Sequence, residues 1–147
     1  MFIDAHQHFW QYAAADYPWI DSSMKRLARD FLPADLTAIA LPEGVTGSVA
    51  VQARQTVQET DWLLSLAASD PFIRGVVGWV DLRSPTVADE LRCRASNPKL
   101  VGVRHVVQDE PDPRFLLRDD FIRGLKTLEA FQLTYDLLLF PHHLPAA

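Results

Sequence analysis

Short runs of β-branched and apolar residues alternate with helical patterns along the whole chain. The runs that predict strands cover residues 2–8, 45–53, 73–81, 99–107 and 133–140. Strands that alternate with helices form parallel sheets with right-handed crossovers, and a high content of Val and Leu is typical of strands buried in such sheets. The sequence therefore predicts an α/β fold with a parallel sheet.

Helix start signals occupy the segments between these runs, as this alternation requires. They are Pro33, the capping-box segment Thr56-Val57-Gln58-Glu59, the pair Ser84-Pro85, and Asp119 or Asp120. Two architectures fit this order of elements. One is a five-stranded doubly wound sheet, and the other is part of a (β/α)8 barrel.

Polar residues near the carboxyl ends of the predicted strands favour the barrel, because barrel enzymes place their active sites at this end. They are Asp4, His6, His8, Gln52, Asp81, Arg104 and Asp136. A complete barrel needs about 250 residues, whereas this chain has 147. We therefore predict a single domain over residues 1–147 that is the N-terminal part of a truncated (β/α)8 TIM barrel, with about the first four and a half βα units.

Two histidines one residue apart end the first predicted strand. If residues 2–8 form a strand, the side chains of Asp4, His6 and His8 share one face. Neighbours on that face lie roughly 6.5–7 Å apart at the backbone, so two imidazoles can lean onto one ion. The pattern predicts half of a metal site, with two structural histidines as the alternative.

Composition excludes several classes of partner. The net charge of −5 leaves no basic stripe for nucleic acid. The apolar stretches are far shorter than a bilayer span, and the N-terminus lacks the pattern of a signal peptide. The single cysteine, Cys93, excludes an internal disulfide and fits a reducing cytoplasm. We expect a cytoplasmic protein with no nucleic-acid or membrane partner.

A series of motifs resembles the amidohydrolase superfamily, in the branch of metal-dependent barrel hydrolases that includes sugar lactonases such as L-fuconolactonase and L-rhamnonolactonase. The segments that carry the resemblance are Ile3–Trp10, Tyr17–Ile20, Arg29–Leu36, Val51–Ala53, Gly75–Asp81, Gly102–His105 and Tyr135–Leu138. Their order and spacing cover the chain nearly end to end. The resemblance implies a hydrolase that opens a sugar lactone.

The resemblance also implies roles for individual residues. His6 and His8 match the metal-binding pair of the first strand, for zinc or manganese, although some lactonases of this branch work without a tightly bound metal. The candidate catalytic residues are Asp81, Arg104 and His105, and the candidate substrate-binding residues are Gln52, Trp79 and Trp10. In this scheme a carboxylate takes a proton from water, and Arg104 stabilises the oxyanion.

Each of these polar residues also has a structural interpretation. Gln52 can bond a neighbouring loop, Asp81 can cap a turn, and Arg104 can form a buried ion pair with Asp81 or Asp136. Because successive strand residues point to opposite faces, Arg104 and His105 cannot both face the barrel interior unless a bulge intervenes. We therefore expect one of these two to be structural.

The chain departs from the family in ways that leave other functions open. Further metal ligands come from strands six and eight of the family barrel, which lie beyond this length. Arg104 stands near the position of the strand-four ligand and cannot bind a cation. The alternatives are an inactive fragment, a pair of copies that associate through exposed sheet edges, a non-catalytic binding or regulatory module, and a decarboxylase-type enzyme of the same fold.

Overall fold

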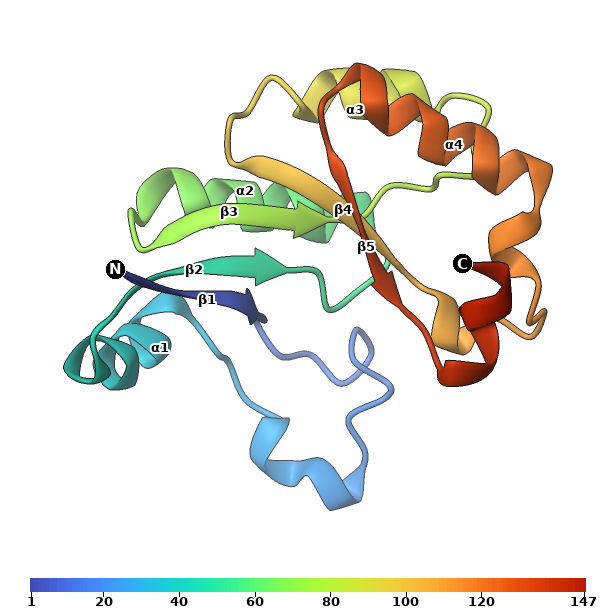
Figure 1. Ribbon diagram of the computed structural model, residues 1–147. Helices are drawn as coiled ribbons and strands as arrows, with labels where there is room; N and C mark the ends of the chain where they lie inside the picture. The colour runs from blue at the N-terminus through green and yellow to red at the C-terminus, as the bar shows by residue number, and fades with distance from the viewer.

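A computed structural model describes all 147 residues and contains one parallel sheet (Figure 1). Its strands are β1 (Phe2–Gln7), β2 (Val45–Val51), β3 (Ile73–Gly78), β4 (Leu100–Val106) and β5 (Thr134–Leu138). They lie in the order β1-β2-β3-β4-β5, and every neighbouring pair is parallel. The predicted α/β class and the partial barrel are confirmed, whereas a doubly wound sheet would reverse its strand order.

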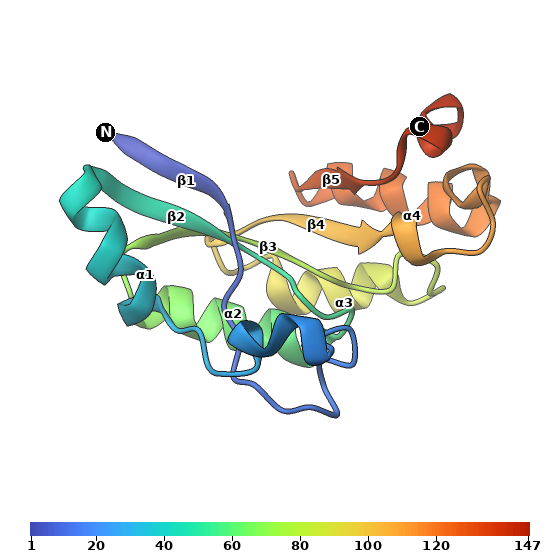
Figure 2. The same ribbon diagram turned by 90° about the horizontal axis from the view of Figure 1, so that it is seen from below.

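The sheet is curled, and the helices lie on its outer side (Figure 2). The helices are α1 (Pro33–Ala40), α2 (Val57–Ser69), α3 (Val87–Arg94) and α4 (Asp119–Ala130). Short 3-10 segments cover Ser22–Leu27, Leu41–Glu43, Val107–Asp109, Phe115–Leu117 and Pro141–Ala146. None of the helices is long and apolar enough to cross a membrane. The result is a half-barrel whose inner face is open.

Two apolar clusters join the helices to the outer face of the sheet. One packs Leu63 and Ala67 of α2 against Ala50 and Val76 of the strands. The other joins Val103 of β4 to residues of α3, α4 and the loops beside them, which are Val80, Leu82, Val87, Leu91, Val107, Phe115, Leu116, Phe121 and Leu128. Helices α2, α3 and α4 therefore bury their apolar sides in these two clusters, whereas α1 buries Ala40 alone.

The strands end earlier than predicted, by one to three residues at their carboxyl ends. His8, Gln52 and Asp81 therefore lie just beyond β1, β2 and β3 and belong to the loops that follow. Helix α3 begins at Val87, so Ser84 and Pro85 form the turn that precedes it. These differences matter for the site, because a residue past a strand end is freed from the strict alternation of faces.

Candidate active site at the carboxyl ends of the strands

A cavity of about 400 Å³ lies where β1, β2, β4 and β5 end. Its lining residues are His8, Trp10, Trp19, Gln52, Ala53, Arg104, Val106, Gln108, Asp109 and Leu138. Four of the predicted site residues, His8, Trp10, Gln52 and Arg104, are among them. His6 adjoins the cavity through contacts with His8 and Arg104.

The two histidines of the first strand meet, as their spacing predicts. The Nε2 atoms of His6 and His8 are 3.2 Å apart, and the rings stand nearly perpendicular with centroids 4.9 Å apart. His8 Nδ1 lies 2.9 Å from the carbonyl oxygen of Val51. Because a carbonyl oxygen can only accept, Nδ1 carries the ring hydrogen and Nε2 carries the lone pair.

Both imidazoles are neutral near pH 7. Burial lowers the pKa of His8 to about 4, and burial together with the Arg104 charge lowers the pKa of His6. Arg104 Nη1 lies 3.1 Å from His6 Nε2, and a guanidinium can only donate. When these contacts form, both Nε2 atoms present lone pairs toward each other, an arrangement that a shared cation would relieve.

This pair fits two ligands of a metal ion. Nitrogen ligands lie about 2.0–2.1 Å from tetrahedral zinc, which places them roughly 3.3–3.4 Å from each other. The observed separation of 3.2 Å is close to that value. No third His, Cys, Asp or Glu side chain joins them in a metal-binding cluster. The chain therefore offers two candidate nitrogen ligands, and Arg104 stands beside them.

Arg104 reaches the cavity from β4 and is almost fully buried. Its Nη2 donates to the backbone oxygen of Gln52 at 2.5 Å and to the side-chain oxygen at 2.7 Å. Arg104 Nε and Gln52 Nε2 are buried donors without a partner. No carboxylate lies within ion-pair distance of Arg104, so the alternative role of Arg104 in an ion pair with Asp81 or Asp136 is wrong. Two unpaired donors make this corner suited to an acceptor group.

His105 lies on the opposite face of β4 from Arg104. Its ring stacks on Phe115 with centroids 4.8 Å apart. Its Nδ1 accepts from Trp79 Nε1 at 3.4 Å, and its Nε2 donates to Glu110 Oε1 at 2.7 Å. The expectation that only one of Arg104 and His105 faces the interior therefore matches the structure. The structure places His105 on the helix side of the sheet, because β4 alternates without a bulge in this region. Trp79 lies beside His105 there, and the roles predicted for both residues stay predictions.

Asp81 also lies outside the cavity. It is exposed and accepts the backbone N–H of Arg83 at 3.0 Å. This contact is the turn-capping role that was the alternative for this residue. Asp81 does not line the cavity, and β3 ends three residues before Asp81. The catalytic role of Asp81 therefore stays a prediction.

Several lining residues were missed by reasoning from the sequence. Trp19 stands edge-to-face with Trp10 at a centroid distance of 6.1 Å. Gln108 and Asp109 belong to the short 3-10 turn after β4. The available signals were the aromatic loop after β1 and the acidic loop after β4, since barrel sites are built from such loops.

Comparisons with known sequences show the family of this chain. Residues 3–147 match the family described as Amidohydrolase. An L-fucono-1,5-lactonase of Burkholderia multivorans is 47% identical over 144 residues, covering 97% of this chain and 48% of that protein. An L-fucono-1,5-lactonase of Burkholderia ambifaria is 38% identical over 144 residues, covering 98% of this chain and 50% of that protein.

Solved structures of amidohydrolases share the fold of this chain. A crystal structure of an amidohydrolase from Burkholderia multivorans with bound zinc superposes with a TM-score of 0.94 at 46% sequence identity. The match covers 99% of this chain and 51% of that one. An amidohydrolase from Bifidobacterium longum subsp. infantis gives a TM-score of 0.66 at 27% identity, over 92% of this chain and 50% of that one. The chain thus spans about half the length of the relatives that it matches.

Proposed function

Because this chain belongs to the amidohydrolase family, we propose that its cavity is part of an active site that hydrolyses the ring ester of a sugar lactone. The observation that carries the proposal is the convergence of His6, His8 and Arg104 at one cavity. Two lactonases among its relatives support the substrate class. A divalent metal is proposed on the same pair of imidazoles, with zinc favoured by the zinc-bound relative.

The proposed reaction needs water, a proton acceptor and stabilisation of negative charge. A divalent metal, when bound by His6 and His8, would polarise the lactone carbonyl or lower the pKa of a water molecule. The water oxygen forms a bond to the carbonyl carbon, and the ring C–O bond then breaks. One proton from the water ends on the released ring oxygen, so the product is an open-chain hydroxy acid.

The chain's own residues supply the remaining steps. Asp109 is the carboxylate that lines the cavity, so we assign to it the proton transfer that the expected mechanism gives to a carboxylate. The guanidinium of Arg104 stabilises the oxyanion, because its unpaired Nε is an available donor. Gln52 Nε2 is a second unpaired donor for a sugar hydroxyl. Trp10 and Trp19 form the apolar wall beside the sugar ring.

A direct assay tests this function. The purified chain is offered L-fucono-1,5-lactone, and acid release is followed in a pH-stat after zinc loading and after chelation. We expect turnover in the zinc-loaded sample and its loss after chelation and in His8→Ala. Unchanged turnover after complete metal removal would exclude the metal role. An absence of turnover in every sample would overturn catalysis by this chain alone and favour a binding module.

Self-association and the cellular location are two further proposals. Self-association through the free edges of β1 and β5 would place a second copy beside the open side of the cavity, and the structure leaves both edges unpaired. A cytoplasmic location is proposed on the lone exposed thiol of Cys93.

A further inference from the structure

Glu59 is a buried carboxylate that the proposed chemistry does not use. It lies in the first turn of α2 and is 4% exposed. Its Oε2 atom accepts the backbone N–H groups of Ala53 at 3.0 Å and of Arg54 at 2.7 Å. The backbone N–H of Glu59 donates to Thr56 Oγ1 at 3.2 Å. The predicted capping box is therefore half formed, and the Glu59 carboxylate reaches further back along the chain instead.

The two amides held by Glu59 directly follow the residues that orient the cavity. The Val51 carbonyl fixes the ring of His8, and both oxygens of Gln52 accept from Arg104. Residues 51–54 thus form one short segment. Its first two residues bind His8 and Arg104, and its last two bind Glu59. One side-chain oxygen that accepts two N–H groups ties both amides of this turn to α2.

We propose that Glu59 is a positioning residue, whose carboxylate fixes the turn after β2 and thereby keeps His8 and Arg104 in the orientation that the cavity requires. The inference rests on the proposed function, because only that function gives the orientation of His8 and Arg104 a role in a reaction. The orientation of His8 can be measured in the chain without turnover.

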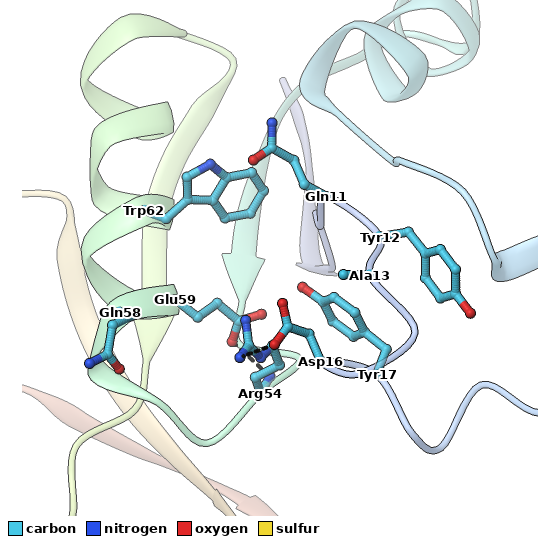
Figure 3. A pocket seen from close by; sticks show the side chains of 9 residues that line it. All are labelled: Gln11, Tyr12, Ala13, Asp16, Tyr17, Arg54, Gln58, Glu59 and Trp62. Atoms are coloured by element: carbon cyan, nitrogen blue, oxygen red, sulfur yellow. Dashed lines mark hydrogen bonds and ion pairs between the residues drawn. The ribbon is translucent and has the colours of Figure 1, made fainter.

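Glu59 is the carboxylate that its surroundings leave available to the two amides. It lies at a separate cavity of about 290 Å³ between α2 and the loop after β1 (Figure 3). Figure 3 shows Arg54 beside the Glu59 carboxylate and turned to Asp16, with which it pairs at 2.8 Å. The guanidinium of Arg54 also lies 5.6 Å from the ring centre of Tyr17. The neighbouring carboxylate of Asp16 is engaged by Arg54, and Glu59 is the acceptor that serves both backbone amides.

The free oxygen of Glu59 permits a conservative variant. Glu59 Oε1 is buried and has no hydrogen-bond partner. In Glu59→Gln, the amide oxygen can take the place of Oε2 while the amide nitrogen takes the place of Oε1 without breaking a bond. Glu59→Ala removes the anchor altogether. Glu59→Asp keeps the charge but shortens the reach by one methylene. Glu129→Gln, an exposed carboxylate of α4 with no partner, is the matched control.

The experiment combines ring ¹⁵N chemical shifts of His8 with zinc affinity by calorimetry. In the zinc-free wild type, we expect a protonated Nδ1 and an unprotonated Nε2. In Glu59→Ala, the two nitrogen shifts should move toward averaged values, and the zinc dissociation constant should rise about 10-fold or more, as when a group that orients a metal ligand is lost. Glu59→Gln should restore the shifts and stay within about threefold in affinity, and Glu129→Gln should match the wild type.

A folded Glu59→Ala with the wild-type His8 shifts would overturn the positioning role. If Glu59→Ala does not fold, the comparison moves to the other two variants. Wild-type shifts in Glu59→Gln with averaged shifts in Glu59→Asp support the role, and the reverse order contradicts it. If the wild type binds no zinc and opens no lactone, the proposed function fails, while the His8 shifts still decide the role of Glu59.

Discussion

His8 and Glu59 flank the turn after β2 and have pKa shifts of opposite sign. Burial lowers the pKa of His8 from 6.5 to about 4, and burial raises the pKa of Glu59 from 4.5 to about 7. Stability from His8 is present above pH 6.5 and is lost as pH falls toward 4. Stability from Glu59 is present below pH 4.5 and is lost as pH rises toward 7. Each shift corresponds to about 3 kcal/mol, so the two dependences oppose each other.

Single variants should separate these two contributions. Relative to the wild type, Glu59→Gln should gain up to about 3 kcal/mol of unfolding free energy between pH 4.5 and 7. His8→Gln should show the reverse trend and gain relative stability as pH falls from 6.5 to 4. Urea unfolding at a series of pH values measures both differences, with Glu129→Gln as the control. A pH-independent difference for Glu59→Gln would show that its folded-state pKa is not raised.

Arg104 is the residue whose geometry a lysine cannot reproduce. Its fork reaches Gln52 and His6 at once, whereas a lysine presents a single compact charge. We expect Arg104→Lys to lower kcat for lactone opening about 100-fold, as does removal of one oxyanion donor elsewhere. Arg92→Lys on the exposed side of α3 is the control. Equal turnover in Arg104→Lys and the wild type would remove Arg104 from the oxyanion role.

At the scale of single elements, Gly124 of α4 packs directly against the backbone of the loop after β3. A Cβ added at Gly124 would lie 1.9 Å from the backbone oxygen of the buried Leu82. Alanine usually gains about 1 kcal/mol over glycine inside a helix, but this overlap forces the helix away from the loop. We expect Gly124→Ala to lower the unfolding free energy by about 1–3 kcal/mol.

Thermal and urea unfolding measure the effect of Gly124→Ala, with Glu129→Ala on the exposed side of α4 as the control. The control should stay within about 0.5 kcal/mol of the wild type. A Gly124→Ala variant that is more stable than the wild type would mean that α4 does not pack this closely against Leu82.

The elements themselves could be predicted from the sequence, because their signals are local. The five strands and four helices follow from apolar runs and from start signals such as Pro33 and Thr56. The side of the sheet to which a residue at a strand end points could not be predicted in the same way. Parity groups Ala50 with Gln52, yet Ala50 packs against α2 and Gln52 contacts Arg104. Strand β2 ends at Val51, so parity no longer governs Gln52.

The choice between Arg104 and His105 also depended on tertiary contacts. Alternation predicts that the two side chains point to opposite faces of β4, but it does not say which one faces inward. Phe115 and Phe121 settle the choice, because they pack against the His105 ring. They come from the loop and helix after β4, and their position beside it depends on the packing of α4.

At the scale of the whole molecule, the half-barrel leaves apolar side chains exposed along both edges. Phe2 of β1 is 72% exposed and Leu137 of β5 is 58% exposed. Both edge strands also lack a partner on one side, since the sheet order begins at β1 and ends at β5. Unpaired strands with exposed apolar residues favour pairing with another chain.

We therefore expect the purified chain to associate as its concentration rises to about 100 µM, with the edges of β1 and β5 as the interface. Lysine on an edge strand opposes pairing through charge, so Phe2→Lys combined with Leu137→Lys should shift the protein toward the monomer. Sedimentation velocity over a concentration series measures this change.

Leu117→Lys, which also replaces an exposed leucine but lies outside both edge strands, should associate like the wild type. Equal association in the edge variant and the wild type would place the interface elsewhere, and a wild-type monomer at every concentration would contradict association through these edges.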